Sequence, residues 1–312
     1  MAPDRPFRFG VQLSGPLPGE TWAGSARKLE DLGYSSLMMP DHLTDQLAPL
    51  TALMAAADAT TELRVGTLVL GNDYRHPAVL AKEIATLDVL SGGRVEFGLG
   101  AGWMTSDYEQ SGLTLDPPAR RVDRFEESIQ VMKALFGDAP VDFDGDHYSI
   151  AGLDGQPKPV SAGGPPLLIG AGGRRMLAIA AREADIVGIN PNLASGEVSA
   201  ELVRDATAEA TDRKLAWVRA DAGERFEQIE LSVLVFMVAV TDDRTQAAEN
   251  MGSLFGVPGE DVLGSPLVLI GTIGEVLEAL QDRRSRWDIS YVVIQGDAVE
   301  SLAPVVDSLT GS

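Results

Sequence analysis

Residues 63–103, LRVGTLVLGNDYRHPAVLAKEIATLDVLSGGRVEFGLGAGW, decide the fold. The stretch begins with an apolar run over 63–71 and has a second one over 94–100, and such continuous runs are typical of strands buried on both faces. Between them, Pro77 is followed by leucine and isoleucine at helical spacing, which predicts a helix that begins at the proline. The stretch therefore predicts a strand–helix–strand unit.

The same alternation continues along the 312-residue chain. Further strand-like runs occupy residues 7–13, 35–41, 166–172, 185–190, 229–241 and 291–295. Helical patterns lie at residues 20–33, 50–60 and 119–136, from the end of the fifth strand to about 184, within 196–222, and at 271–287 and 299–309. Eight strand–helix units in a chain of this length favour a (β/α)₈ TIM barrel over a doubly wound sheet.

No low-complexity linker or change in composition divides the chain, so we expect one domain over residues 1–312. Two inserts interrupt the alternation. The first, 137–165, lies between the fourth and fifth strands and contains Asp144–Gly145 between strand-like residues, which predicts a small hairpin. The second, 242–265, follows the seventh strand. We expect both inserts to shape the substrate pocket.

Composition excludes several classes of site. The chain has no cysteine and three histidines, which rules out disulfides, thiol catalysis and iron–sulfur clusters and argues against a histidine-rich metal centre. A net charge of −21 repels nucleic acid and anionic membranes, so we expect a small-molecule substrate. No apolar stretch approaches the roughly 18 residues of a membrane span, and the N-terminus lacks the apolar core of a signal peptide. We therefore expect a cytoplasmic protein.

The glycines at the end of the 94–100 strand raise the question of a nucleotide loop. Gly98, Gly100 and Gly102 give G-x-G-x-G, whereas a dinucleotide fingerprint is G-x-G-x-x-G leading directly into a helix. Trp103 follows the third glycine, so an NAD-dependent Rossmann enzyme is disfavoured. In a barrel these residues lie at the carboxyl end of a strand, where active sites lie and where glycine lets a flat ligand approach the backbone. The alternative is a tight strand exit without a ligand.

A second glycine-rich segment is a stronger signal. Residues 170–173 end the fifth strand, and a helix follows at once with Arg174 and Arg175. A helix N-terminus with bare backbone N–H groups favours an anion, so this segment predicts a phosphate site. The alternative is a plain strand–helix turn with solvated arginines.

The third candidate is the pair Asp41–His42, which follows the second strand and so lies on the same rim. Histidine exchanges a proton most readily near neutral pH, and Asp41 is placed to anchor a ligand or tune His42. The alternative is a structural histidine.

Together these features resemble the luciferase-like family of flavin- and deazaflavin-dependent oxidoreductases. The resemblance rests on 29–43, 63–103, 168–190 and 267–280, which occur in order and cover most of the chain. The run P-A-V-L-A-K-E…T-L-D-x-L-S-G-G-R-V…G-x-G-A-G-W is its most specific part. Within the family the chain is most similar to the branch that depends on coenzyme F420.

The resemblance implies a barrel with the cofactor across its carboxyl-terminal mouth. It places the cofactor's ring beside the G-x-G-A-G loop, its phosphate on the 170–173 loop and a non-proline cis peptide at Leu68–Val69. We accordingly expect the cofactor to contact Asp41, Leu68, Val69, Gly71, Asn72, Gly100, Ala101, Gly102, Gly170, Ala171, Gly172, Gly173 and Arg174. His42 matches a histidine that acts on the substrate during hydride transfer, and Trp103 and Tyr74 are expected to line the substrate pocket.

One departure concerns the substrate. F420-dependent sugar-phosphate dehydrogenases of the family carry a glutamate where this chain has Trp103, which puts a sugar phosphate in doubt and favours a less polar substrate. The chain is thus expected to transfer a hydride between F420 and an organic molecule, with His42 moving the proton. Two alternatives stay open: an FMN-dependent monooxygenase that uses O₂ and a partner flavin reductase, and a non-catalytic flavin-binding barrel. Relatives are commonly dimers, so a homodimer is expected.

Overall fold

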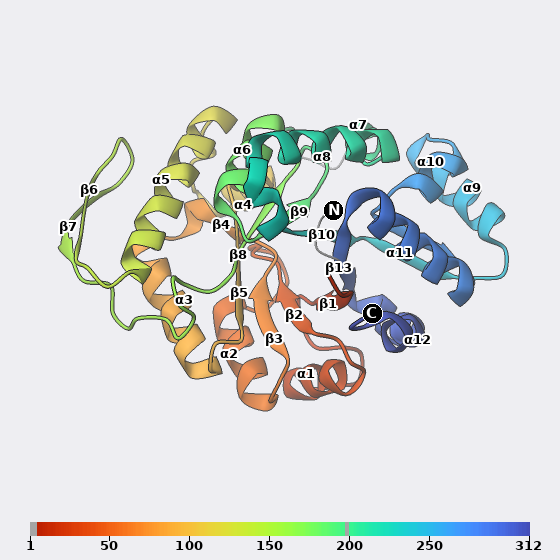
Figure 1. The fold of residues 1–312 in the computed structure, drawn as a ribbon, viewed down its shortest axis with the longest axis horizontal. Coiled ribbons are helices and arrows are strands. Elements are labelled where there is room, and N and C mark those ends of the chain that lie inside the picture. The colour runs from red at the N-terminus through yellow and green to blue at the C-terminus, as the bar shows by residue number, and fades with distance from the viewer. Residues whose placement is uncertain (1–4, 197–199) are drawn as a thin grey trace.

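The computed structural model describes residues 5–196 and 200–312 and contains a closed barrel of eight parallel strands (Figure 1). The strands are β1 (Arg8–Gln12), β2 (Ser36–Met39), β3 (Arg64–Thr67), β5 (Val95–Gly100), β8 (Leu167–Ala171), β9 (Ile186–Ile189), β10 (Glu230–Val235) and β13 (Ile289–Gln295). Pairing of β3 with β5 closes the barrel, and the short β4 (Leu70–Gly71) extends β3 along β5. The (β/α)₈ prediction is confirmed.

Eight helices surround the barrel and turn their apolar faces to the strands. They are α1 (Trp22–Asp31), α2 (Pro49–Ala59), α3 (Pro77–Ser91), α5 (Pro118–Phe136), α6 (Arg174–Glu183), α8 (Ala208–Ala222), α11 (Ile273–Trp287) and α12 (Val299–Leu309). Proline occupies the first turn of α2, α3 and α5, where its missing N–H costs nothing. Within the described ranges, none of the helices combines the length and apolarity needed to traverse a bilayer.

A buried charged cluster fills the amino-terminal end of the barrel. Glu96 of β5 is buried and accepts hydrogen bonds from Arg8, from Arg64 at 2.8 Å and from the Tyr291 hydroxyl at 2.9 Å. The Arg8 guanidinium also stacks over the Tyr291 ring and pairs with Glu230. Each charge of this cluster has a partner of opposite sign, as buried charges require.

The sequence prediction is wrong for two segments. The predicted strand 229–241 is two strands: β10 stays in the barrel, and β11 (Met237–Val240) leaves it to pair with β12 (Val268–Gly271), which the sequence analysis did not predict. The predicted helix within 196–222 is α7 (Ala200–Arg204) and α8, separated by a short turn; residues 197–199 lie outside the described ranges.

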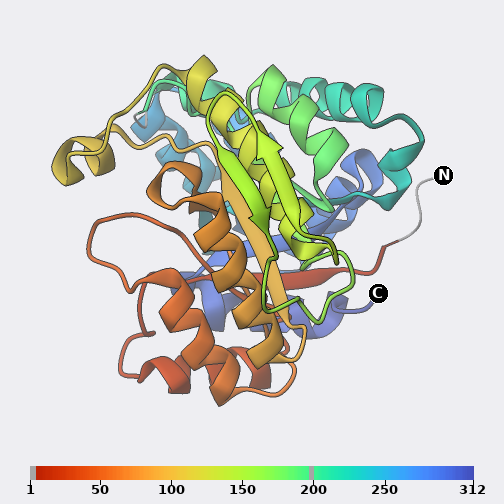
Figure 2. The ribbon, with the colours of Figure 1, turned by 90° about the vertical axis from the view of Figure 1, so that its left-hand side faces the viewer.

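The inserts lie at opposite ends of the long axis (Figure 1). The first contains the predicted hairpin, β6 (Val141–Asp144) and β7 (Ser149–Leu153), which lies along the outside of α5 (Figure 2). The second forms α9 (Arg244–Phe255) and α10 (Gly259–Gly264). The remaining short elements are η1 (Asn72–Tyr74), α4 (Thr105–Ser111), η2 (Gly223–Gln228) and η3 (Gly296–Ala298).

Candidate functional site

A cavity of about 620 Å³ opens at the carboxyl ends of the barrel strands. Its lining comes from the ends of most strands and from the first turn of α6, and it includes His42, Leu68, Val69, Gly71, Tyr74, Gly100, Ala101, Gly102, Trp103, Gly170, Ala171, Gly172, Gly173 and Arg174. Active sites of TIM barrels lie at this end of the strands. The fold thus brings together residues that four separate segments supply.

His42 has a carboxylate partner, but that partner is not its neighbour Asp41. Nδ1 of His42 lies 2.8 Å from Oδ2 of Asp107, which belongs to the short helix α4. The hypothesis that Asp41 tunes His42 is therefore wrong. Helix α4 had no strong periodic pattern, and the only sequence signal for Asp107 was its place shortly after the glycine-rich strand end.

The surroundings of Asp107 fix the tautomer of His42. The Asp107 carboxylate also accepts hydrogen bonds from the Leu43 backbone N–H at 3.1 Å and from the Tyr74 hydroxyl at 3.2 Å. Burial, together with the negative Asp107, raises the pKa of Tyr74, so the phenol keeps its proton and donates it. An ionised carboxylate only accepts, so Nδ1 of His42 carries the hydrogen. The other ring nitrogen, Nε2, has no partner among the described residues and is free for a ligand.

Asp41 instead anchors the wall of the cavity. Its carboxylate binds the Arg75 guanidinium through two hydrogen bonds, of 2.6 and 3.1 Å, and accepts a third from the Gly71 N–H at 3.0 Å. Burial alone would lower the pKa of Arg75, but Asp41 outweighs burial and raises it. Asp41 therefore holds the β4 segment in place. A direct contact between Asp41 and a cofactor stays a prediction.

The peptide between Leu68 and Val69 is cis, as the resemblance implied. The Leu68 carbonyl accepts a 2.7 Å hydrogen bond from Gln12 Nε2, and Gln295 in turn donates to Gln12. Both Leu68 and Val69 are half-buried and line the cavity. They give the cavity an apolar floor of the kind that a flat ring covers.

Gly100, the last residue of β5, and Gly102, just after it, leave room for neighbouring side chains. A Cβ on Gly100 would lie 2.7 Å from a Val69 methyl carbon, and one on Gly102 would overlap the Tyr108 hydroxyl. Gly102 also has a φ of +76°, which other residues rarely adopt. These contacts are one reason for glycine at both positions, and because Gly100 and Gly102 also line the cavity, the approach of a ligand to their backbone stays a prediction.

The segment 170–173 lies at the mouth, and α6 begins directly after it. Gly173 is the N-cap of α6 and has no side chain with which to cap the helix. The Arg174 guanidinium is half-exposed at this position and pairs with Asp221. Backbone N–H groups of an uncapped first turn suit an anion, which agrees with the predicted phosphate site.

Two expectations about the lining are wrong. Asn72 is buried and does not line the cavity; its side chain contacts Tyr148 of the hairpin, with 3.5 Å between Nδ2 and the hydroxyl oxygen. Neither the 137–165 insert nor the 242–265 insert contributes a lining residue. The residues that line the cavity in their place come from the segment before α4 and from the loop after β9.

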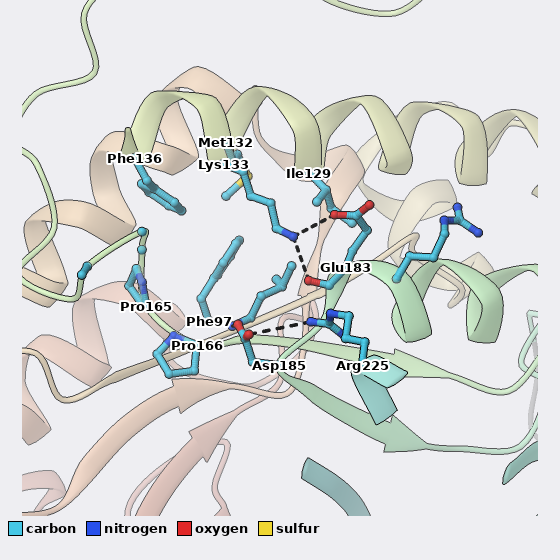
Figure 3. A pocket seen from close by; sticks show the side chains of 15 residues that line it. Phe97, Ile129, Met132, Lys133, Phe136, Pro165, Pro166, Glu183, Asp185 and Arg225 are labelled. Carbon is cyan, nitrogen blue, oxygen red and sulfur yellow. Dashed lines mark hydrogen bonds and ion pairs between the residues drawn. The ribbon is translucent and has the colours of Figure 1, made fainter. Parts of the chain in front are cut away.

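A second cavity, of about 610 Å³, lies at the opposite end of the barrel between α5 and α6 (Figure 3). Its apolar side chains include Phe97 and Phe136, and Lys133 on its rim pairs with Glu183 at 2.8 Å. Arg225 lies 3.9 Å from Asp185 on the same rim. None of the predicted site residues lines this cavity, so the mouth of the barrel is the candidate active site.

Comparison with known proteins identifies the family of the chain. Residues 6–286 match the family model described as luciferase-like monooxygenase. An uncharacterised protein of Mycobacterium tuberculosis is 32% identical over 202 residues, 57% of this chain and 71% of that protein. The F420-dependent glucose-6-phosphate dehydrogenase of Amycolatopsis mediterranei is 34% identical over 155 residues, 45% of this chain and 46% of that enzyme.

The fold has a close counterpart among solved structures. The coenzyme F420-dependent tetrahydromethanopterin reductase of Methanopyrus kandleri superposes with a TM-score of 0.75 at 19% identity, over 96% of this chain and 98% of that one. At this level of identity the similarity concerns the fold alone. Because the family model spans nearly the whole chain, the protein belongs to the luciferase-like monooxygenase family.

Proposed function

We propose that the protein transfers a hydride between coenzyme F420 and a small organic substrate. The observation that carries the proposal is the Asp107–His42 pair, whose free Nε2 faces the same cavity as the Leu68–Val69 floor. The F420-dependent names of a sequence relative and of a structural neighbour support F420 as the cofactor.

The residues at the mouth fit such a cofactor. Leu68 and Val69 offer apolar side chains to one face of a ring, and the uncapped start of α6 with Arg174 offers donors to a phosphate. F420, when bound, would supply a two-electron hydride donor or acceptor. The chain's own contribution is to hold the substrate and to move a proton.

In the proposed reaction His42 gives or takes that proton. With Nδ1 hydrogen-bonded to Asp107, neutral His42 presents the Nε2 lone pair to the substrate. In the oxidising direction Nε2 takes the hydroxyl proton as the hydride leaves the carbinol carbon; in the reducing direction the imidazolium returns it to the developing oxyanion. Asp107 stabilises the imidazolium in either direction.

The first test is a pair of fluorescence titrations of the cofactor-free protein with F420 and with FMN, because Trp103 lines the cavity. Micromolar binding of F420 with weak binding of FMN supports the proposal. His42→Ala should then lower turnover by roughly 100-fold or more while the F420 dissociation constant changes little. Equal loss of turnover and of F420 binding would contradict the role assigned to His42.

The second candidate is an FMN-dependent monooxygenase, which the family description favours. The same floor and the same phosphate site would serve reduced FMN, with O₂ as co-substrate and a flavin reductase as partner. Tight binding of FMN with weak binding of F420 would establish this candidate. Binding of either cofactor without any turnover would instead support a non-catalytic barrel.

A further inference from the structure

Three arginines line the cavity: Arg121, Arg174 and Arg175. Arg174 pairs with Asp221 and Arg175 pairs with Asp123 at the start of α6, which is the side proposed for the cofactor phosphate. Arg121 of α5 has no carboxylate partner among the described residues, but it is buried and its guanidinium donates to backbone carbonyls.

The side of the cavity around His42 is lined mainly by apolar and aromatic side chains and by one carboxylate. We define the His42 wall as Pro40, His42, Tyr74, Trp103, Met104 and Asp107, all of which line the cavity. Asp107 has no Lys or Arg partner among the described residues, so His42 alone faces its negative charge. Asp41 adds no net charge, because Arg75 neutralises it. Asp107 is thus the acidic side chain of the wall that no Lys or Arg of the described residues pairs with.

The rest of the wall is apolar or aromatic. The Trp103 ring meets the imidazole of His42 edge-on, with 5.8 Å between ring centroids. Beyond the wall, Phe236 at the end of β10 lines the same cavity and leaves 48% of its surface exposed. Large apolar side chains that stay exposed inside a concave site are typical of surfaces that a ligand covers.

We infer that the substrate is an uncharged, largely apolar molecule with one oxygen at or beside the reacting carbon. The oxygen meets Nε2 of His42, and the hydrocarbon body lies against Trp103 and Phe236. A phosphate or carboxylate on the substrate would face the buried charge of Asp107, while Arg121, the cavity arginine that has no carboxylate partner among the described residues, is buried and donates to backbone carbonyls. The inference rests on the proposed function for the nature of the reaction, but the preference for neutral ligands is a property of the wall alone.

The test uses two ligands with one carbon skeleton, methyl 4-oxocyclohexanecarboxylate and the corresponding carboxylate anion. Their binding is measured at pH 7.5 by quenching of tryptophan fluorescence and by the shift in Tm, with and without F420. We expect the neutral ester to bind at least about tenfold more tightly than the anion. Equal or tighter binding of the anion, or no binding of the ester at millimolar concentration, would overturn the inference.

Two variants distinguish the effect of the Asp107 charge on ligand binding from the effect of apolar contact. Asp107→Asn removes the charge and keeps the shape, so it should reduce the preference for the ester by about threefold or more. Trp103→Gln should weaken binding of the ester and leave binding of the anion nearly unchanged; because this variant removes the fluorescent reporter of the cavity, its binding is measured by the shift in Tm. A preference that survives Asp107→Asn in full would refute the electrostatic argument. If F420 fails to bind while the ester preference persists, the proposed function fails and this inference stands.

Discussion

Oδ2 of Asp107 lies 2.8 Å from Nδ1 of His42, although 65 positions separate the two residues in the chain. The contact joins the end of β2 to the helix that follows β5. In the proposed reaction Asp107 is a positioning residue, since it would act on the proton transfer through the histidine.

Asp107→Asn should lower kcat by roughly 100-fold or more, because the amide can stabilise the wrong tautomer and cannot stabilise the imidazolium. The measurement is kcat and KM together with the F420 dissociation constant. We expect the loss to fall on kcat, with KM and F420 binding little changed. A purely structural residue would impair KM and F420 binding as well as kcat. Tyr74→Phe removes the other side-chain hydrogen bond to Oδ2 and should have a smaller effect.

Gly102→Ala should destabilise the fold by about 2 kcal/mol or more, because the new Cβ overlaps the Tyr108 hydroxyl and φ is +76°. Gly173→Ala is the matched control. Its Cβ would have no neighbour closer than 3.5 Å, so it should change stability by less than about 1 kcal/mol. Urea denaturation of both variants measures the difference. Equal destabilisation would show that overlap with Tyr108 is not the reason for glycine at position 102.

Glu96 should make stability depend on pH. Burial alone would raise the pKa of this carboxyl, but Arg8 and Arg64 outweigh burial and hold the pKa below its ordinary value of 4.5. A pKa that is lower in the folded state means that the contribution to stability is complete above about pH 4.5 and is lost as the pH falls through the folded value. Glu96→Gln should cost about 3 kcal/mol or more at pH 7, because Arg64 loses its carboxylate partner and Arg8 keeps only Glu230.

The measurement for Glu96 is the free energy of unfolding of both proteins at pH 7 and pH 4. The difference between wild type and Glu96→Gln should shrink at the lower pH. A difference that stays constant would mean that other carboxylates carry the acid sensitivity.

Asp221→Asn should tighten binding of the phosphate-bearing cofactor about threefold, because it frees the Arg174 guanidinium from its ion pair. Arg174→Gln should weaken binding by about tenfold and reduce its dependence on salt. Arg286→Gln breaks an exposed ion pair with Asp212 outside the cavity. It should change neither the affinity for the cofactor nor its dependence on salt. Titrations at two ionic strengths distinguish these outcomes.

Much of the architecture follows from local patterns. Continuous apolar runs marked the eight strands, and proline or glycine marked where α3 begins and ends, because each of these signals acts within a few residues. The same patterns placed His42 and the 170–173 segment on one rim, and the family resemblance added the Leu68–Val69 peptide. Parallel strands of a barrel bring their carboxyl ends together, so the mouth of the barrel could be predicted before any contact was known.

Only the tertiary structure determined which groups meet there. It paired His42 with Asp107 rather than with Asp41, gave Asp41 to Arg75, and turned β11 out of the barrel toward β12. It also showed that Gly102 makes room for Tyr108. These contacts join residues far apart in sequence, and each depends on how side chains fill the space between strands and helices. The sequence by itself determined the barrel and the end at which the candidate site lies, whereas long-range packing decided which side chains meet at that end.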